Sequence, residues 1–319
     1  MTPDQLDNIV KIVVAGGTGL AGSSIARAFE SKGDHVIRIN RSVVDLLDAN
    51  STEKFIFEVK PAMIVDAAAK VGGIGANNSY PVEFLSDNIT IQGNLMRAAH
   101  KAHVASFVFL GSSCIYPRDC AQPIKEEYLM TGPLEATNSA YAIAKIAGIE
   151  MVNSYRKEYG TKWISLMPTN LYGPRDNFDL ASSHVLPAFI RRFVDAAESK
   201  ADKVTLWGSG APLREFLHVD DLAKAVVLAS DEYDSDLHLN VGTGEDISIK
   251  ELAQKVADAA GYIGEIEWDS SKPDGTLRKV LDVSRIKELG WRPTITLDEG
   301  IASTIAWYKD ASARGEVRK

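Results

Sequence analysis

Through the first half of the chain, short apolar runs alternate with longer stretches in which apolar residues recur every three or four positions. The short runs predict buried strands and the longer stretches predict amphipathic helices. This alternation is typical of an α/β fold of the Rossmann type, a doubly wound parallel sheet covered by helices. The expected strands are Lys11–Ala15, His35–Asn40, Ala62–Asp66, Ser106–Leu110 and Trp163–Met167, and the expected helices are Leu20–Ser31, Pro81 to about His103, and Ser139–Tyr159.

The alternation weakens after Tyr172, where turns rich in glycine and proline interrupt it. We therefore expect a second, smaller α/β lobe, to which the family resemblance given below assigns the binding of the substrate. The stretch Val219–Ser230 predicts a helix that returns to the first domain, so both parts are discontinuous. The predicted boundaries are 1–172 and 211–243 for the dinucleotide-binding domain, and 173–210 and 244–319 for the substrate lobe, which includes helices at Ile249–Ala260 and Leu297–Trp307.

The charge distribution narrows the classes of partner. The formal net charge is -8, without a basic stripe, which argues against nucleic acid or a membrane surface as the partner. The start of the chain, Met1–Asp7, is acidic and lacks the features of a signal peptide, and no apolar run is long enough to span a bilayer. Cys114 and Cys120 are too few for a disulfide framework and lie outside any metal-binding spacing. We expect a cytoplasmic protein without a bound metal.

A glycine-rich turn directly follows the first predicted strand. Gly16 permits a tight turn, Gly19 allows the backbone to approach a pyrophosphate, and Gly22 allows the next helix to pack closely on the strand. Because the helix starts at this turn, its N-terminus faces the phosphates. This context predicts a dinucleotide site that comprises Gly16, Thr18, Gly19, Leu20, Ala21 and Gly22.

The end of the second predicted strand indicates which dinucleotide is bound. Enzymes that select NAD usually place an acid there to accept the ribose 2′-hydroxyl, whereas this chain has Asn40-Arg41-Ser42. Arg41 can pair with a 2′-phosphate, so we predict NADP(H), although a solvated surface arginine would also fit. After the third strand, the small side chain of Ala68 leaves room for the cofactor, and simple packing would explain it equally well.

Tyr141 and Lys145 lie four residues apart on one predicted helix, so their side chains share a face. A nearby cation favours the phenolate, and we therefore expect Lys145 to lower the pKa of Tyr141. Tyr141 could then donate a proton to a ketone that receives a hydride. The pair alone is a weak signal, since Tyr and Lys often line a helix surface. Ser112 strengthens it, because it follows a strand at the edge of the sheet where ligands bind.

These features occur in the order that is typical of the short-chain dehydrogenase/reductase superfamily, in its extended branch that modifies sugar nucleotides. Longer segments are more specific and together resemble the GDP-L-fucose synthase family over nearly the whole chain. The segments that carry this resemblance are Ala68–Ile74, Leu110–Pro117, Tyr141–Gly148, Met167–Pro174, Asp176–Phe178 and Arg214–Asp221.

The resemblance implies a bifunctional enzyme that epimerises GDP-4-keto-6-deoxy-D-mannose at C3 and C5 and then reduces its C4 ketone with NADPH to give GDP-L-fucose. By family analogy, Cys114 removes the proton and His184 returns one from the opposite face. Ser112 and Tyr141 hold the carbonyl oxygen, and Lys145 also binds the nicotinamide ribose. Without the family, Cys114 would be interpreted as an inert buried thiol and His184 as a polar or capping residue.

The same resemblance implies further contacts. We expect a homodimer joined through the helices at Pro81–His103 and Ser139–Tyr159. The Asp220-Asp221 pair is interpreted as a helix cap without chemistry. Arg192, Trp207, Arg214, Lys279 and Asn170 are expected to bind the GDP-sugar, with a solvated surface position as the alternative for Arg192 and Lys279. Leu110, Gly111, Pro168, Asn170, Leu171 and His184 are expected to line the cofactor site, together with Tyr141 and Lys145.

Three other functions remain open at this stage. A 4,6-dehydratase would carry an Asp-Glu pair where this chain has Cys114-Ile115, which argues against it. A 4-epimerase would prefer tightly bound NAD and would need no thiol base. A non-catalytic NADP-binding sensor would need neither Ser112 nor the Tyr141 and Lys145 pair.

Overall fold

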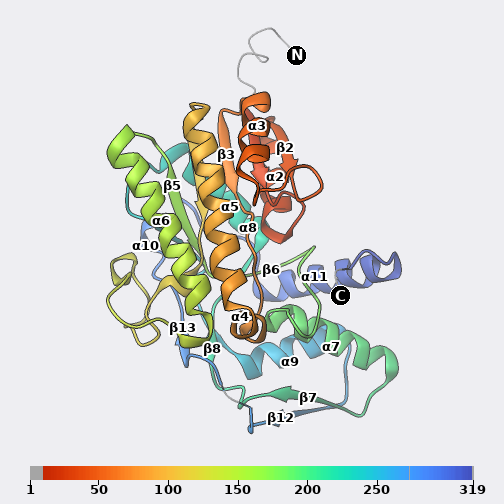
Figure 1. Ribbon diagram of the computed structural model, residues 1–319. Helices are drawn as coiled ribbons and strands as arrows, with labels where there is room; N and C mark the ends of the chain where they lie inside the picture. The colour runs from red at the N-terminus through yellow and green to blue at the C-terminus, as the bar shows by residue number, and fades with distance from the viewer. Residues whose placement is uncertain (1–9, 273, 318–319) are drawn as a thin grey trace.

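The computed structural model describes residues 10–272 and 274–317, and it has the predicted α/β architecture (Figure 1). A six-stranded sheet has the order β10-β5-β4-β3-β1-β2, and every neighbouring pair in it is parallel. The chain winds outward from β1 in both directions, so the topological switch point lies between β1 and β3. The strands are β1 Lys11–Ala15, β2 His35–Ile39, β3 Met63–Asp66, β4 Ser106–Leu110, β5 Ile164–Pro168 and β10 Leu239–Val241.

Helices cover this sheet. One pair that packs together is α5 and α6, with α3 beside α5, and a second pair is α2 and α8. Figure 1 shows α5 and α6 side by side along the sheet. The bounds are α2 Leu20–Lys32, α3 Ala49–Val59, α5 Pro81–Lys101, α6 Ser139–Tyr159 and α8 Val219–Glu232.

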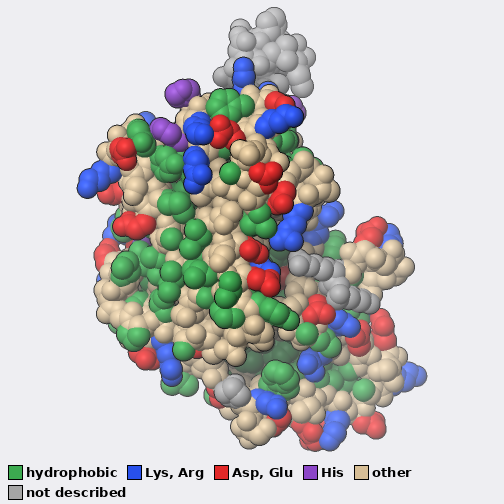
Figure 2. Space-filling view, viewed as in Figure 1, with side chains coloured by type: hydrophobic (Ala, Val, Ile, Leu, Met, Phe, Trp, Pro, Cys, Tyr) green, Lys and Arg blue, Asp and Glu red, His purple; other side chains and the backbone are tan. Residues whose placement is uncertain are grey.

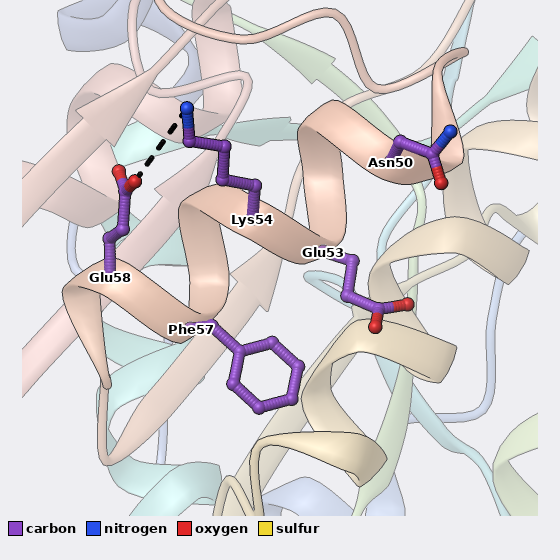
Figure 3. Close-up of a pocket in the computed structure, with 5 residues that line it drawn as sticks. All are labelled: Asn50, Glu53, Lys54, Phe57 and Glu58. Carbon is purple, nitrogen blue, oxygen red and sulfur yellow. Dashed lines mark ion pairs between the residues drawn. The ribbon is translucent and has the colours of Figure 1, made fainter.

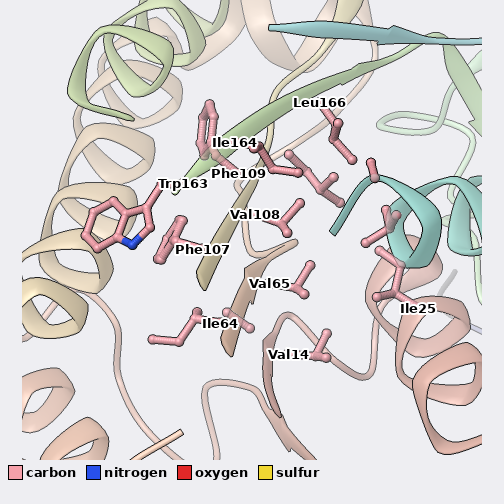
Figure 4. Close-up of a cluster of buried hydrophobic side chains, with 14 of the residues drawn as sticks. Val14, Ile25, Ile64, Val65, Phe107, Val108, Phe109, Trp163, Ile164 and Leu166 are labelled. Carbon is pink, nitrogen blue, oxygen red and sulfur yellow. The ribbon is translucent and has the colours of Figure 1, made fainter. Parts of the chain in front are cut away.

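The sheet is buried because its strands are apolar on both faces. Val14, Val65 and Val108 come from three adjacent strands and are at most 1% exposed, and Ile25 of α2 packs among them (Figure 4). The ring of Trp163 lies 5.1 Å from that of Phe107 at one end of the cluster. This continuous apolar core holds the strands in register, so that their carboxyl ends lie along one edge of the sheet.

A second buried cluster lies around α7 Val185–Ser199, α9 Ile249–Ala260 and α11 Leu297–Ala313. Its existence supports the predicted smaller lobe, whose boundaries stay a prediction. Leu281, Val283, Ile286 and Trp291 belong to the first cluster instead. The remaining elements are α4 Ile74–Ser79, α10 Ser284–Glu288, the 3-10 turns η1 Ser113–Ile115, η2 Glu126–Tyr128 and η3 Ala136–Asn138, the pairs β6 Asn170–Tyr172 with β9 Phe216–His218 and β7 Lys203–Trp207 with β12 Glu265–Asp269, and a sheet of β11 Ile247–Ser248, β8 Leu213–Arg214 and β13 Arg278–Lys279.

The expected strands and the early helices lie within one or two residues of their predicted bounds, and α6 and α9 have the predicted bounds. The assignment of Asp220-Asp221 as a helix cap was wrong. The helix α8 begins at Val219, and the ring nitrogen of His218 accepts the capping hydrogen bond from the Asp220 amide at 3.2 Å. Asp221 instead accepts hydrogen bonds from the amides of Thr294 and Ile295.

The segment Met1–Asp7, on which the prediction about a signal peptide rests, lies outside the described residues. None of the helices in residues 10–272 and 274–317 combines the length and hydropathy needed to cross a bilayer.

Candidate active site

The glycine turn joins β1 to α2 at the switch point of the sheet. Gly16 has a φ of 71°, and a Cβ there would lie 2.6 Å from the carbonyl oxygen of Ala67. A Cβ on Gly22 would collide with the backbone of Gly16, so the first turn of α2 packs directly on the loop. Gly19 is the N-cap of α2 and has no capping side chain. The loop therefore exposes its backbone next to a helix N-terminus, as a pyrophosphate site requires.

The turn after β2 lies beside this loop. The side-chain amide of Asn40 is 3.5 Å from the hydroxyl of Thr18, and its oxygen accepts hydrogen bonds from both the amide and the hydroxyl of Ser42. Arg41 is exposed on the same turn, whereas Arg38 forms an ion pair with Glu30. Residues 40–42 thus offer an arginine and two polar side chains, and no acid, at the position that contacts the adenosine ribose of a bound dinucleotide.

Tyr141 and Lys145 project from α6, but they do not interact as predicted. The ammonium of Lys145 donates a hydrogen bond of 2.8 Å to the carbonyl oxygen of Leu110 and lies 5.9 Å from the centre of the Tyr141 ring. The pKa of Tyr141 is raised far above its ordinary value, first by burial and then by Cys114 and Asp66. The expectation that Lys145 lowers this pKa was wrong, because burial dominates and the ammonium is directed toward Leu110.

Ser112 and Cys114 follow the end of β4, where η1 begins. The hydroxyl of Ser112 accepts a hydrogen bond of 3.4 Å from the amide of Cys114, whose side chain is buried. Burial raises the pKa of the Cys114 thiol, and Lys279, Ser112 and Lys145 each lower it. Two lysines therefore favour the thiolate at this position.

His184 and Lys279 come from other parts of the chain. His184 is the N-cap residue of α7, but its side chain makes no capping hydrogen bond and remains accessible to solvent. Loss of hydration among the surrounding protein atoms lowers the pKa of its imidazole, and the positive charge of Lys279 lowers it further. Lys279 thus lies within electrostatic range of both His184 and Cys114, and Cys114 lies within electrostatic range of Tyr141 and Lys145.

Asp66 belongs to this site and was missed by sequence reasoning. It is fully buried at the end of β3, opposite Phe109 of β4, over whose ring the Lys145 ammonium lies at 4.7 Å. One carboxylate oxygen accepts a hydrogen bond from the amide of Ala68, and the other has no hydrogen-bond partner among the described residues. Burial raises the pKa of Asp66 to about 6, and Lys145 opposes that shift. A carboxylate that ends an otherwise apolar strand was the available signal.

The residues expected to bind the GDP-sugar lie on several elements. Arg214 and Lys279 are register partners in the parallel pair β8 and β13. Trp207 is 70% exposed at the end of β7, with the Lys272 ammonium 5.7 Å from its ring centre. Arg192 lies half-buried on α7. The side-chain amide of Asn170 donates to the carbonyl oxygen of Glu215 at 2.8 Å, so this amide is already engaged by the protein.

Of the other expected cofactor residues, Leu110 ends β4 and Gly111 follows it, Pro168 ends β5, and Leu171 packs against the first buried cluster. Ala68, Leu20 and Ala21 are partly buried beside the glycine turn. The carboxyl edge of the sheet therefore collects most of the predicted cofactor residues.

A surface depression on α3 has no part in this chemistry (Figure 3). It is lined by Asn50, Glu53, Lys54, Phe57 and Glu58, and Lys54 and Glu58 approach each other to 3.9 Å. Among the described residues, no cluster of His, Cys, Asp or Glu could hold a metal ion.

The fold, the glycine turn and the Tyr141 and Lys145 pair define a class of Rossmann enzymes that use a nicotinamide cofactor. The chain matches the NAD dependent epimerase/dehydratase family over residues 12–242, and it belongs to this family.

Within the family, the chain belongs with the GDP-L-fucose synthases. It is 48% identical over 303 residues to GDP-L-fucose synthase 1 of Arabidopsis thaliana, covering 95% of this chain and 94% of the relative. It is 47% identical over 314 residues to GDP-L-fucose synthase of Escherichia coli (strain K12), covering 95% and 98%. The structure of a GDP-L-fucose synthetase from Naegleria fowleri bound to NADP is similar, with a TM-score of 0.88, 27% identity and coverage of 97% and 96%.

Proposed function

We propose that this protein converts GDP-4-keto-6-deoxy-D-mannose to GDP-L-fucose, by epimerisation at C3 and C5 followed by NADPH-dependent reduction at C4. The observation that carries the proposal is the gathering of Cys114, Tyr141, Lys145 and His184 within electrostatic range of one another or of Lys279. Identity of nearly one half to two GDP-L-fucose synthases, over almost the full length of both, supports the substrate assignment.

Epimerisation needs a base and an acid on opposite faces of the sugar. The C4 carbonyl acidifies the hydrogens at C3 and C5, so Cys114 as thiolate can remove either proton and form an enolate. Ser112 and Tyr141 donate hydrogen bonds to the oxygen that takes up this charge. His184 then delivers a proton to the other face of the same carbon. Lys279 supports both steps, because its charge favours the thiolate of Cys114 and makes the imidazolium of His184 a stronger acid.

Reduction requires a nicotinamide cofactor, and the loop between β1 and α2 fits its pyrophosphate. A side chain at Gly16 would collide with the backbone of Ala67, and one at Gly22 would collide with the backbone of Gly16. Glycine at both positions therefore allows the tight loop that a pyrophosphate site needs. Bound NADPH supplies the hydride to C4. Arg41 is suited to the 2′-phosphate, and Tyr141 donates the proton to O4. The raised pKa of Tyr141 keeps the phenol protonated at neutral pH, as a proton donor requires.

The test is incubation with GDP-4-keto-6-deoxy-D-mannose and NADPH in deuterated water, followed by NMR of the product. We expect GDP-L-fucose with deuterium at C3 and C5, and faster consumption of NADPH than of NADH. Absence of label with reduction at C4 would indicate a simple 4-reductase. Absence of NADPH consumption with this and other nucleotide 4-ketosugars would overturn the enzyme assignment in favour of a binding protein.

We also propose a homodimer that forms through α5 and α6, in the cytoplasm. Large apolar side chains are exposed on these helices, among them Val82 and Ile89 on α5 and Ile143 and Tyr159 on α6. Figure 2 shows apolar side chains gathered over this part of the molecule. An exposed apolar face of this kind is typical of an interface between subunits.

A further inference from the structure

We propose that Gly73 and Asn77 are positioning residues that hold His184 in place across the active site. The inference rests on the proposed function, in which His184 delivers the proton during epimerisation. Gly73 immediately precedes α4 and Asn77 lies within it, in the segment that follows β3, whereas His184 is the N-cap residue of α7. Neither Gly73 nor Asn77 takes part in proton or hydride transfer in the proposed reaction.

The contact is a close approach of two backbones. The amide of Gly73 donates a hydrogen bond of 2.9 Å to the carbonyl oxygen of Ser182. A Cβ on Gly73 would lie 2.6 Å from the carbonyl oxygen of Ser183, a distance that real Cβ atoms do not adopt. His184 is the next residue along the chain. Glycine is therefore required at position 73 for the loop before His184 to occupy its observed place.

The Gly73 side of this contact is itself fixed. The side-chain amide of Asn77 donates to the carbonyl oxygens of Gly72 and Gly73, at 2.7 and 3.1 Å. Asn88 of α5 then holds both the amide and the carbonyl of Lys70, at 2.8 and 3.0 Å. Because Asn77 and Asn88 are both buried, these hydrogen bonds are shielded from water and hold the segment 70–77 as a rigid support.

The other side is a compact turn. The amide of Ser183 donates to the carbonyl oxygen of Asp179 at 2.8 Å, and the hydroxyl of Ser182 donates to the Asp179 carboxylate at 2.9 Å. The side-chain amide of Asn177 donates to the Ser182 hydroxyl at 2.9 Å. The turn thus moves as a unit, and any displacement of the Ser182 and Ser183 carbonyls is passed on to His184.

His184 depends on this support because its own side chain contributes no cap to α7. The imidazole is therefore placed by the backbone that precedes it and by the start of the helix. Proton transfer to carbon requires the imidazole nitrogen within about 3 Å of its target, so a shift of the order of 1 Å reduces the rate steeply.

The deciding variant is Gly73→Ala, which adds one methyl group at φ -65° and ψ 177°, a conformation that alanine adopts without strain. Its matched control is Gly75→Ala, two residues later in α4, where the new Cβ would have its nearest neighbour, the Ala181 carbonyl oxygen, at 3.9 Å. We expect Gly73→Ala to slow deuterium incorporation at C3 and C5 by about tenfold or more. The alkylation rate of Cys114 should stay at its wild-type value, and Gly75→Ala should match wild type throughout.

The product distinguishes positioning from a general structural defect. With NADPH present, Gly73→Ala should accumulate sugar that is reduced at C4 without inversion, whereas a folding defect would lower both reactions together. Wild-type exchange in Gly73→Ala, or an equal loss of exchange and reduction, would overturn the inference. If Gly73→Ala does not fold, Asn77→Ala decides, because it removes two hydrogen bonds and adds no atom. Asn77→Ala should also accumulate sugar that is reduced at C4 without inversion, with a smaller loss of exchange than in Gly73→Ala. A wild-type ratio of inverted to non-inverted product in Asn77→Ala would overturn the inference.

The two proposals fail in different ways. Should the wild-type protein itself incorporate no deuterium, the proposed function is wrong. Should the wild type exchange and Gly73→Ala exchange equally well, only the positioning role of Gly73 and Asn77 is wrong.

Discussion

At the scale of single residues, burial governs the chemistry of this site more than pairwise contacts do. Tyr141, Cys114 and Lys145 each have a pKa displaced first by loss of water, in the direction of the neutral form. A buried neutral phenol suits a proton donor, but a buried neutral thiol is a poor base. Lys279 therefore gains importance, since its charge is the largest influence that lowers the pKa of Cys114.

Cys114→Ser should separate the two reactions. A serine hydroxyl in the same place is too weak an acid to form the base, whereas Tyr141 and Lys145 are untouched. We expect deuterium incorporation at C3 and C5 to fall by at least about 100-fold while reduction at C4 stays measurable. NMR of the product should reveal a reduced sugar without inversion. Unchanged output of GDP-L-fucose would exclude Cys114 as the base.

Lys279→Met should shift the pH dependence of Cys114. The ammonium lowers the pKa of the thiol, so its removal raises that pKa and moves thiolate formation to higher pH. Alkylation of Cys114 by iodoacetamide, measured as rate against pH, should show a more alkaline midpoint in the variant. Lys272→Met is the control, since Lys272 lies over the Trp207 ring and should leave the profile unchanged. An identical profile in Lys279→Met would show that its charge does not reach the thiol.

Asp66→Asn should change how stability depends on pH. The folded carboxyl has a pKa of about 6 against an ordinary 3.8, so the folded protein holds a proton that the unfolded chain releases in this range. The free energy of unfolding of the wild type therefore decreases as pH rises from about 4 to 6, by about 3 kcal/mol from this group.

The advantage of Asp66→Asn over wild type should consequently grow by that amount between pH 4 and pH 7, in urea unfolding followed at each pH. A constant difference across this range would mean that the carboxyl ionises as it does in water.

At the scale of elements, helix α6 carries Tyr141 and Lys145 and must lie close to β4, which leads to Ser112 and Cys114. Gly148 makes this possible, because a Cβ there would overlap the ring of Phe109 on β4. The same ring lies under the Lys145 ammonium. The distance between the helix and the strand therefore determines where the Tyr141 phenol lies relative to the Cys114 thiol.

Gly148→Ala should destabilise the protein by about 1–3 kcal/mol through overpacking. It should also lower the rate of C4 reduction, because α6 moves away from β4. Gly93→Ala on α5 is the matched control, since its Cβ would have only the Met151 sulfur at 4.0 Å. That variant should be neutral or up to about 1 kcal/mol more stable, as alanine favours the helix. Thermal unfolding of both variants would contradict the packing argument if Gly148→Ala melted at or above wild type.

At the scale of the whole molecule, the site exists only because distant parts of the chain meet. Lys279 comes from β13, Cys114 from the turn η1 after β4, and His184 from the position just before α7. The segment 70–77 connects the cofactor side to the turn before His184. Both sides are therefore held together by backbone contacts as well as by the two buried clusters.

Replacement of Ile89 and Ile143 by Glu should disrupt the proposed dimer. Their side chains are exposed on α5 and α6, and charge placed at an apolar interface opposes association. Sedimentation at micromolar concentration should show dimer for wild type and monomer for the double variant. Ile263→Glu, on the loop after α9, is the control and should stay dimeric. A monomeric wild type, or a double variant that remains dimeric, would refute this interface.

The sequence by itself determined the elements and the cofactor loop, because both depend on local features. Periodicity of apolar residues specifies strands and helices, and the spacing of Gly16, Gly19 and Gly22 specifies the turn. The resemblance of long segments then indicated Cys114, Tyr141, Lys145 and His184. Only the tertiary structure decided how these groups affect one another. Burial and neighbours from distant segments set the pKa values of Tyr141 and Asp66, and no local pattern records the approach of Gly73 to Ser182 and Ser183.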